Sequence, residues 1–380
     1  MTTIVPTHPP RSPRTSSTTF LLFTLLSLVP WLAIAQTAPP PLPTPIQNLP
    51  VRPLKTRQPE QVKAHILLDV QIADKAGNPV TNIDPFDFNL LDNREPQKLL
   101  VIQHAGINAA SPRPPAELII LLDAVNCTFQ SMQLERQNVV LYLLRNGGRL
   151  NQPTTIILLT DTELKIQPKP SMDGNALAKA IEKSPNPVHT LHYAAGYAGE
   201  MEREEWSLRN VSKLAIYESA RPGRKLVLWI SHGWPPLDQS DNYLSDYYLK
   251  GIFRNVVQLN NELVAARITL DAIDPRGPVP GVNPFYYLDY VKPLTRYTEA
   301  RSPNLMLEVL ATHTGGRVLD ISTDILSEID LCLSDLNSWY TLLYNAPPST
   351  KPDQFHAIAV RVNRPNTQTR AISGYYSQPK

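Results

Sequence analysis

The chain has 380 residues, of which 42% are hydrophobic and 18% are charged, and its 36 lysine and arginine residues nearly balance its 34 aspartate and glutamate residues. This balance gives no indication of a polyanionic partner, and we expect the chain not to bind nucleic acid. Two cysteines are too few for a small disulfide-stapled scaffold, and a chain of this length can bury a sizeable core without disulfides.

The first 35 residues have the features of a secretory signal peptide. Arg11 and Arg14 form a basic start, residues 20–32 are almost continuously apolar, and residues 33–35 read Ala-Ile-Ala, which favours cleavage before Gln36. The apolar run is shorter than the roughly 20 residues of a membrane span. We therefore expect an exported protein that is periplasmic, envelope-associated or secreted and has no stable membrane span; retention of the segment as an anchor is the alternative.

Residues 36–60 are rich in proline, as in Pro-Pro-Pro-Leu-Pro-Thr-Pro, and are predicted to be an extended linker. The segment 61–113 then contains three predicted strands, at residues 62–73, 86–91 and 99–104, with turn residues after the first. This pattern predicts a small β-unit.

The segment 114–336 alternates between the two kinds of secondary structure. Apolar, β-branched runs predict parallel strands at residues 118–122, 155–159, 226–230 and 268–273, and residues 315–319 resemble one more strand. Helices are expected at residues 130–145, 175–183, 204–219, 243–265, 304–312 and 323–336, the first with Leu134, Val140, Leu141 and Leu144 on its buried stripe. The alternation indicates an α/β fold with a doubly wound, mostly parallel sheet. Three more strands are predicted in 337–380.

Several segments carry a family resemblance. Residues 70–80, Val-Gln-Ile-Ala-Asp-Lys-Ala-Gly-Asn-Pro-Val, are followed by Asp-Pro-Phe-Asp-Phe-Asn-Leu-Leu-Asp-Asn at 84–93, and the chain closes with Ser-Trp-Tyr-Thr-Leu-Leu-Tyr and Ser-Gly-Tyr-Tyr. These sequences resemble the acidobacterial VWFA-related proteins of the von Willebrand factor A-type superfamily. The resemblance implies an A-type domain at 114–336, and, together with the strand count, it implies that 61–113 and 337–380 pack as one β-sandwich-like unit.

The resemblance also implies a site at the end of the first core strand. A-type domains carry D-x-S-x-S there, and these side chains help to hold a divalent cation. In this chain Asp123 keeps the carboxylate, but Val125 and Cys127 replace the two serines, and His232 stands where a later carboxylate is expected. Because magnesium requires hard oxygen ligands, we expect a degenerate metal site with no bound metal and no other cofactor.

Asp123 has two alternative roles: it caps the following helix, or it contacts His232 in a pH-sensitive pair that replaces the metal. A hydrolase-like enzyme is the alternative to a binding protein, because Ser231, His232 and Cys127 are catalytic residue types. No G-x-S-x-G elbow is present, and His189 and His192 lack the further ligands of a zinc site. We therefore predict that the chain is not an enzyme. Both cysteines are expected to be buried and free, with a disulfide as the alternative.

Aromatic residues follow two of the predicted strand ends. Trp234 and several tyrosines follow the strand that ends at Ser231, while Tyr286, Tyr287 and Tyr290 lie in a proline-rich loop after Asp274. Tyrosine and tryptophan are enriched in protein interfaces, although these rings could equally pack the loop against itself. The resulting prediction is an exported adhesion or scaffold protein. It would bind another protein or an envelope component through Asp123, Asn126, His232, Trp234, Tyr286, Tyr287 and Tyr290.

Overall fold

A computed structural model describes residues 65–106, 116–184, 196–234 and 245–378, except positions 282, 321 and 350. The described residues all belong to one compact unit, residues 61–380. The predicted signal peptide, the linker at 36–60, His189 and His192 lie outside them. No helix in the described part has the length and apolar character needed to cross a membrane.

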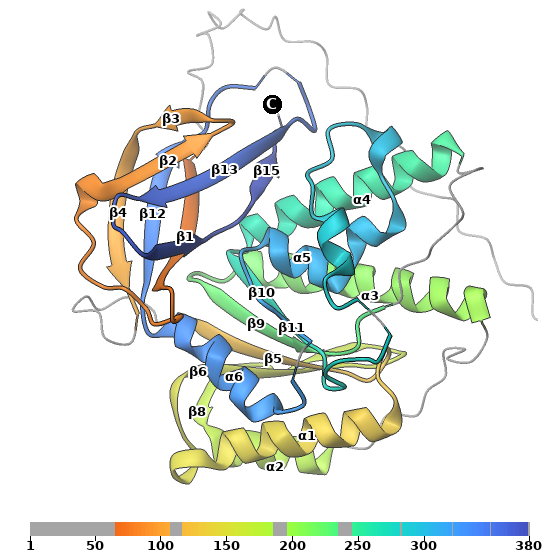
Figure 1. Cartoon of the computed structure of the whole chain (residues 1–380). Coiled ribbons are helices and arrows are strands. Elements are labelled where there is room, and N and C mark those ends of the chain that lie inside the picture. The colour runs from red at the N-terminus through yellow and green to blue at the C-terminus, as the bar shows by residue number, and fades with distance from the viewer. Residues whose placement is uncertain are drawn as a thin grey trace, which may run out of the picture. The chain divides into compact units, whose positions relative to one another are not determined.

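A seven-stranded sheet forms the centre of the unit (Figure 1). Its strand order is β11-β10-β9-β5-β6-β7, with β8 also paired to β6; β7 and β8 are antiparallel to β6 and the other pairs are parallel. The strands are β5 (Glu117–Asp123), β6 (Arg149–Leu159), β7 (Leu164–Ile166), β8 (Ser171–Asp173), β9 (Lys225–Ile230), β10 (Ile268–Ile273) and β11 (Val318–Leu319). Every residue of β5 and β9 is buried, as expected for central strands covered on both faces.

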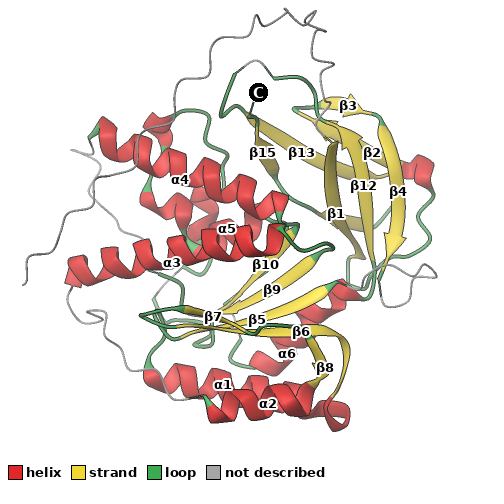
Figure 2. Cartoon of the chain, turned by 180° about the vertical axis from the view of Figure 1, so that it is seen from behind, coloured by secondary structure: helices red, strands yellow, loops and turns green. Residues whose placement is uncertain are grey.

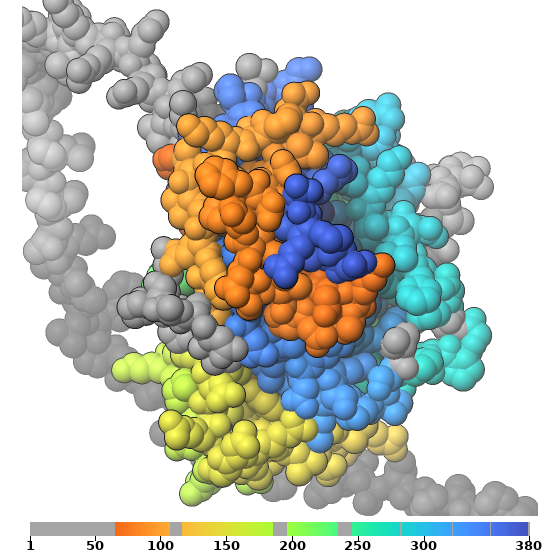
Figure 3. Space-filling view, turned by 60° about the vertical axis from the view of Figure 1, so that its left-hand side comes forward, coloured from red at the N-terminus to blue at the C-terminus, as the bar shows by residue number. Residues whose placement is uncertain are grey.

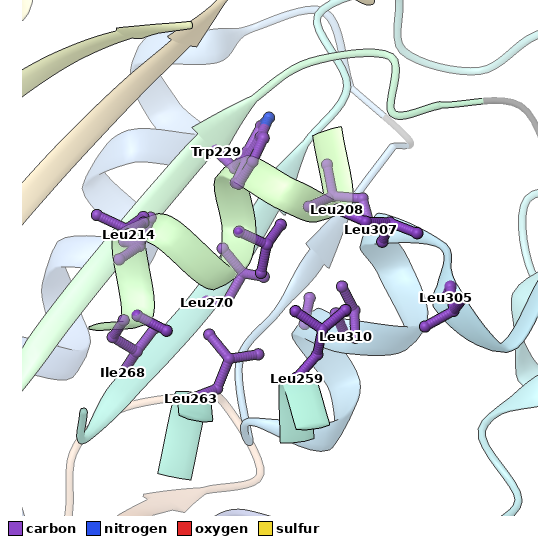
Figure 4. Close-up of a cluster of buried hydrophobic side chains, with 14 of the residues drawn as sticks. Leu208, Leu214, Trp229, Leu259, Leu263, Ile268, Leu270, Leu305, Leu307 and Leu310 are labelled. Carbon is purple, nitrogen blue, oxygen red and sulfur yellow. The ribbon is translucent and has the colours of Figure 1, made fainter. Parts of the chain in front are cut away.

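Helices cover both faces of this sheet (Figures 1 and 2). One face carries α1 (Phe129–Leu144), α2 (Gly174–Lys183) and α6 (Ile325–Leu333), and the other carries α3 (Gly196–Ser219), α4 (Asp246–Ala265) and α5 (Leu307–His313). Figure 4 shows the second layer, where Leu208 of α3, Leu259 of α4 and Leu310 of α5 join one buried cluster with Trp229 of the sheet. The predicted α/β fold is therefore confirmed.

Two four-stranded antiparallel sheets make up the remainder of the unit. One has the order β14-β1-β12-β4 and the other β15-β13-β2-β3, and an apolar cluster that includes Val70, Leu90, Leu342 and Val360 joins them. The strands are β1 (His65–Asp74), β2 (Phe88–Asp92), β3 (Glu95–Gln97), β4 (Leu99–Ala105), β12 (Trp339–Asn345), β13 (Phe355–Val362), β14 (Thr367–Arg370) and β15 (Gly374–Tyr376). Strands from before and after the α/β segment therefore pair directly, and Figure 3 shows them side by side in orange and dark blue.

Two polar connections join the β-sheets to the α/β core. Asp335, in the 3-10 helix η6 (Ser334–Leu336), accepts hydrogen bonds from Arg317 before β11 and from Arg370 of β14. Asn261 of α4 exchanges two hydrogen bonds with the backbone of Tyr376, each 2.9 Å long. Because both connections are partly or fully buried, they fix the β-sheets against the core.

The structure corrects the predicted buried face of α1. Leu134, Leu141 and Leu144 are 43%, 55% and 43% exposed, whereas Glu135, Val139 and Leu143 of the same helix are buried. Apolar residues occur all round this helix, so its sequence does not fix which side faces the sheet. Some predicted boundaries also differ: α3 begins at Gly196 and not at Glu204, and the short strands β3, β7 and β8 were not predicted.

Candidate functional site at the carboxyl edge of the parallel sheet

The carboxyl ends of β5 and β9 lie next to each other at the point where the strand order reverses. Leu122 of β5 pairs with Ile230 of β9, so Asp123, the last residue of β5, and Ser231, which directly follows β9, lie at the ends of adjacent strands. The chain then passes from β5 to α1 on one face and from β9 toward α4 on the other face. Open α/β sheets bind ligands at such a crevice, so this edge is the candidate functional site.

Five protein donors surround the carboxylate of Asp123. Its Oδ1 accepts the backbone N–H groups of Val125 at 2.9 Å and Asn126 at 3.0 Å. Its Oδ2 accepts the indole N–H of Trp229 at 3.0 Å, the hydroxyl of Ser231 at 2.8 Å and the side-chain amide of Asn126 at 2.8 Å. Asp123 is completely buried. Its charge is therefore stabilised inside the protein, by groups that belong to the fold itself.

These contacts do not fit a divalent cation at this position. Both oxygens of Asp123 already face hydrogen-bond donors, and the buried side chains of Val125 and Cys127 stand where the motif requires hydroxyls. Among the described residues, no group of three or more His, Cys, Asp or Glu side chains is placed to hold a metal ion. In this chain Trp229, Ser231 and Asn126 donate hydrogen bonds to the Asp123 carboxylate in the place of a cation.

Both predicted roles of Asp123 need correction. The side chain that caps α1 belongs to Thr128, which accepts the N–H of Ser131 at 3.1 Å. The imidazole of His232 lies 3.0 Å from the hydroxyl of Ser131, and no hydrogen bond joins it to Asp123 among the described residues. The two residues share one sheet edge, as predicted, but Asp123 holds the turn after β5 while His232 contacts the start of α1.

The buried residues at this edge are also unsuited to contact a macromolecule. Asp123, Asn126 and Trp234 are at most 4% exposed. The indole N–H of Trp234 donates to the carbonyl of Leu305 at 3.0 Å, and its ring meets that of Trp229 edge to face. These three predicted partner-binding residues therefore support the fold, because a partner cannot reach side chains that are already packed.

The hydroxyl groups near His232 are not arranged as in a catalytic triad, in which a histidine base pairs with a nucleophile and with an acidic residue. The Ser231 hydroxyl is buried and donates to Asp123, whereas the imidazole of His232 is paired with Ser131. Ser131 contacts His232 and also accepts from the Thr128 hydroxyl at 3.0 Å. Burial and the nearby Arg276 lower the pKa of His232, against weaker opposing effects of Asp274 and Asp123. A neutral imidazole is therefore favoured here.

Cys127 is fully buried beside Glu135 of α1. Burial raises the pKa of its thiol well above the usual value, and the neighbouring Glu135 and Asp123 raise it further. Burial also raises the pKa of Glu135 well above its usual value, against the opposing effect of its hydrogen bond with Cys127. Cys127 therefore lacks the thiolate that a nucleophile requires.

Neither cysteine should react with a thiol reagent in the native protein. Cys127 and Cys332 are both completely buried and both free, so we expect Ellman's reagent to modify them at least about 100-fold more slowly than in the unfolded chain. Unfolding in guanidinium chloride should release two reactive thiols. Rapid modification of one native thiol would show that the turn after β5 opens readily, and would contradict the closed arrangement around Asp123.

A group of acidic side chains lies beyond His232, around the ends of β10 and β11. Asp274 forms an ion pair with Arg276 at 2.6 Å, and Glu308 of α5 lies beside Gly233. Burial raises the pKa of Glu308 to about 7 and that of Glu328 to about 8, and in both cases Asp274 and Asp320 add to the shift. Both carboxylate oxygens of Glu328 are buried and have no hydrogen-bond partner among the described residues.

This acidic group should make stability fall as the pH rises. In the unfolded chain Glu308 and Glu328 lose their protons near 4.5, whereas in the folded protein they keep them up to pH about 7 and about 8. Between pH 4.5 and about 8 the folded state therefore binds more protons than the unfolded state. The contribution of these two groups to the free energy of unfolding is greatest below pH 4.5 and declines as the pH rises to about 8. We expect Glu328→Gln to raise the free energy of unfolding by about 1 to 3 kcal/mol at pH 8.5, and by much less at pH 5.5.

Urea titrations at the two pH values would measure this difference. Glu182→Gln, at an exposed position of α2, is the matched control and should change stability equally little at both. A Glu328→Gln variant that is destabilised at pH 8.5 would contradict the prediction.

The loop from Asp274 to Ala300 presents exposed apolar side chains at this edge. Phe285 and Leu288 are 56% and 48% exposed; Phe285 directly precedes the 3-10 helix η3 (Tyr286–Tyr290), and Leu288 lies within it. Tyr286, Tyr287 and Tyr290 are half-buried, and burial next to Glu308 raises the pKa of Tyr286 well above its usual value. The predicted tyrosines therefore contribute partly to packing, and the side chains most available to a partner are their neighbours Phe285 and Leu288.

Comparisons with known proteins do not identify a family. No family model matches the chain, and no curated protein matches it. One solved structure similar to it is that of the human COPII-coat protein Sec24c, with 9% sequence identity and a TM-score of 0.32. The match covers 73% of this chain and 46% of Sec24c, so the chain spans about half the length of that protein. A likeness this weak carries no conclusion about function.

Sequence reasoning did not find the acidic group or the contacts of Asp123. Glu328 stands inside the apolar stripe of α6, and a charged residue in such a position is a sequence signal of a buried carboxylate, whereas α1 has no apolar stripe that would single out Glu135. The donors to Asp123 come from separate segments, and only the pairing of β5 with β9 brings Trp229 and Ser231 to it.

Proposed function

We propose that this chain is an exported, non-enzymatic adhesion or scaffold protein of the von Willebrand factor A type, related to the acidobacterial VWFA-related proteins. It binds another protein or an envelope component at the carboxyl edge of its parallel sheet, and it does so without a metal ion. The sequence motifs quoted above support the family. The strand order, which reverses between β5 and β9, and the helices on both faces support an A-type arrangement of the core.

One observation carries the metal-independent mode of binding. The carboxylate that a cation would need is saturated by Val125, Asn126, Trp229 and Ser231, so a partner's acidic group has no ion to complete. Contact must then come from the side chains that remain accessible at the same edge. Phe285 and Leu288 provide apolar area there, and the half-buried Tyr286, Tyr287 and Tyr290 beside them hold the loop in place. Aromatic and apolar anchors of this kind supply most of the binding energy of protein interfaces.

A capture experiment with the envelope fraction tests the proposal. We expect the double substitution Phe285→Ser and Leu288→Ser to reduce capture of the partner at least about tenfold without changing thermal stability, because two interface anchors are lost while buried residues stay in place. Capture by the unchanged protein should be the same with magnesium and with EDTA.

The matched control is Phe86→Ser with Leu100→Ser, two exposed apolar positions of the β-sheets that are 96% and 44% exposed. This pair should leave capture unchanged. Loss of capture in EDTA would contradict metal-independent binding, and equal loss in both double variants would show that the carboxyl edge is not the binding surface.

A further inference from the structure

A separate hollow lies on the face of the sheet that α1 and α2 cover, and none of the residues of the loop at 274–300 lines it. Its volume is about 410 Å³, which falls in the range of small-molecule sites, roughly 300 to 1,000 Å³. Figures 1 and 2 show α1 and α2 side by side over β6, with β7 at the sheet edge. The floor consists of Leu122, Ile156 and Leu158 of the sheet, and α2 contributes Ala180 and Ile181.

The floor of this hollow is sheet surface that the helices leave partly uncovered. Ile156 and Leu158, which face α1 and α2, are only half-buried, although a parallel sheet of this kind normally has both faces covered. An apolar ligand that occupied the hollow would complete the coverage and remove this surface from water. Such burial contributes favourable free energy in proportion to the apolar area removed.

Hydrogen bonds hold the walls of the hollow in place. The guanidinium of Arg136 donates to the carbonyls of Ile181 and Ser184, the latter at 2.8 Å, which fixes the end of α2. The side chain of Gln167 accepts the N–H of Ile156 at 3.2 Å and donates to the carbonyl of Lys169 at 2.6 Å, which fixes the chain after β7. The hollow is therefore formed before any ligand binds, and a ligand would not need to order it.

All the charged side chains that line the hollow are basic. They are Arg136, Lys165 and Lys183, and no aspartate or glutamate lines it. Lys165 and Lys183 are exposed, and neither forms an ion pair among the described residues. In a chain with nearly equal numbers of acidic and basic residues, an apolar hollow with only basic groups at its rim favours a ligand that is apolar along its body and anionic at one end.

We propose that this hollow binds a single-chain aliphatic carboxylate, with its hydrocarbon tail over Ile156 and Leu158 and its carboxylate between Lys165 and Lys183. The apolar floor takes up the tail, and the two ammonium groups attract the anionic end from solvent. This binding is independent of the carboxyl edge, because the hollow shares no residue with the loop at 274–300.

Isothermal titration of the full chain with sodium decanoate tests the proposal. We expect saturable binding at one site per chain, and clearly weaker binding of decyltrimethylammonium, which has the same tail and the opposite charge. Substitution of both Lys165 and Lys183 by glutamine should weaken decanoate binding about three- to tenfold, as expected for two exposed charges. The control pair Lys169→Gln and Lys179→Gln removes the same charge from residues that do not line the hollow, and should leave binding unchanged.

A second pair of variants tests the hollow itself. Ala180→Phe, from an exposed position on α2, should fill the hollow and abolish decanoate binding without unfolding the protein. Ala176→Phe lies on the same helix, is also exposed and does not line the hollow, so it should bind decanoate normally. No saturable binding by the unchanged protein, equal binding of the two amphiphiles, or undiminished binding by Ala180→Phe would each overturn the proposal.

Discussion

Replacement of Asp335 by alanine is expected to lower the free energy of unfolding by about 3 to 5 kcal/mol, because it removes one partner of a buried charge cluster. Asp335 is 4% exposed and accepts from Arg317 at 2.8 Å and from Arg370 at 2.7 and 2.6 Å. Without the carboxylate, the guanidinium groups of Arg317 and Arg370 both lose the ion-pair partner that they share. Urea unfolding followed by circular dichroism would measure the loss.

The same substitution should loosen the β-sheets from the core. Arg370 belongs to β14, while Arg317 precedes β11 of the central sheet, so Asp335 joins strands of two different sheets. We expect hydrogen exchange to show reduced protection of β1 and β14 before the central strands are affected. Asp330→Ala is the control, because its ion pair with Arg145 is surface-exposed and should contribute less than about 1 kcal/mol. An Asp335→Ala variant as stable as this control would show that the connection is unimportant.

Asp123→Ala is the second substitution with a large expected effect, about 3 to 5 kcal/mol of lost stability. It leaves the indole N–H of Trp229, the amide of Asn126 and two backbone N–H groups buried without their acceptor. Each unsatisfied buried donor costs about 1 to 3 kcal/mol, and relaxation of the turn recovers part of the total. Thermal unfolding of the variant against Asp289→Ala, an exposed carboxylate in η3, would measure the effect.

Magnesium distinguishes this internal role from a metal-binding one. A cation held only by the native state at 100 times its dissociation constant would stabilise the protein by about 2.7 kcal/mol. Because the Asp123 carboxylate is already saturated, we expect the melting temperature of the unchanged protein to be the same with magnesium, with calcium and with EDTA. A rise with either cation that Asp123→Ala abolishes would show that the hydrogen bonds around Asp123 give way to a metal ion.

Side chains of the fold itself hold the turn after β5 together. Val125 and Cys127 fill space, and Trp229 and Ser231 donate to Asp123. What the carboxyl edge presents to solvent is the loop with Phe285 and Leu288, on which the proposed partner binding rests.

The sequence by itself determined the class of fold and the position of its central strands. Residues 118–122, 226–230 and 268–273 were predicted as strands within one residue of their observed bounds, because continuous runs of apolar and β-branched residues are buried on both faces in any packing of the chain. The sequence also placed Asp123 and His232 at one sheet edge, since the ends of parallel strands meet there.

Only the tertiary structure decided how those residues are used. The buried side of α1 depends on which neighbours the helix meets, and so Leu134 and Leu141 face solvent while Glu135 faces the core. The partners of Asp123 come from β9 and from the turn after β5, and the basic hollow combines β6, β7, α1 and α2. Such sites depend on contacts between segments far apart in the chain, and the local sequence of a segment does not specify which other segment it will contact.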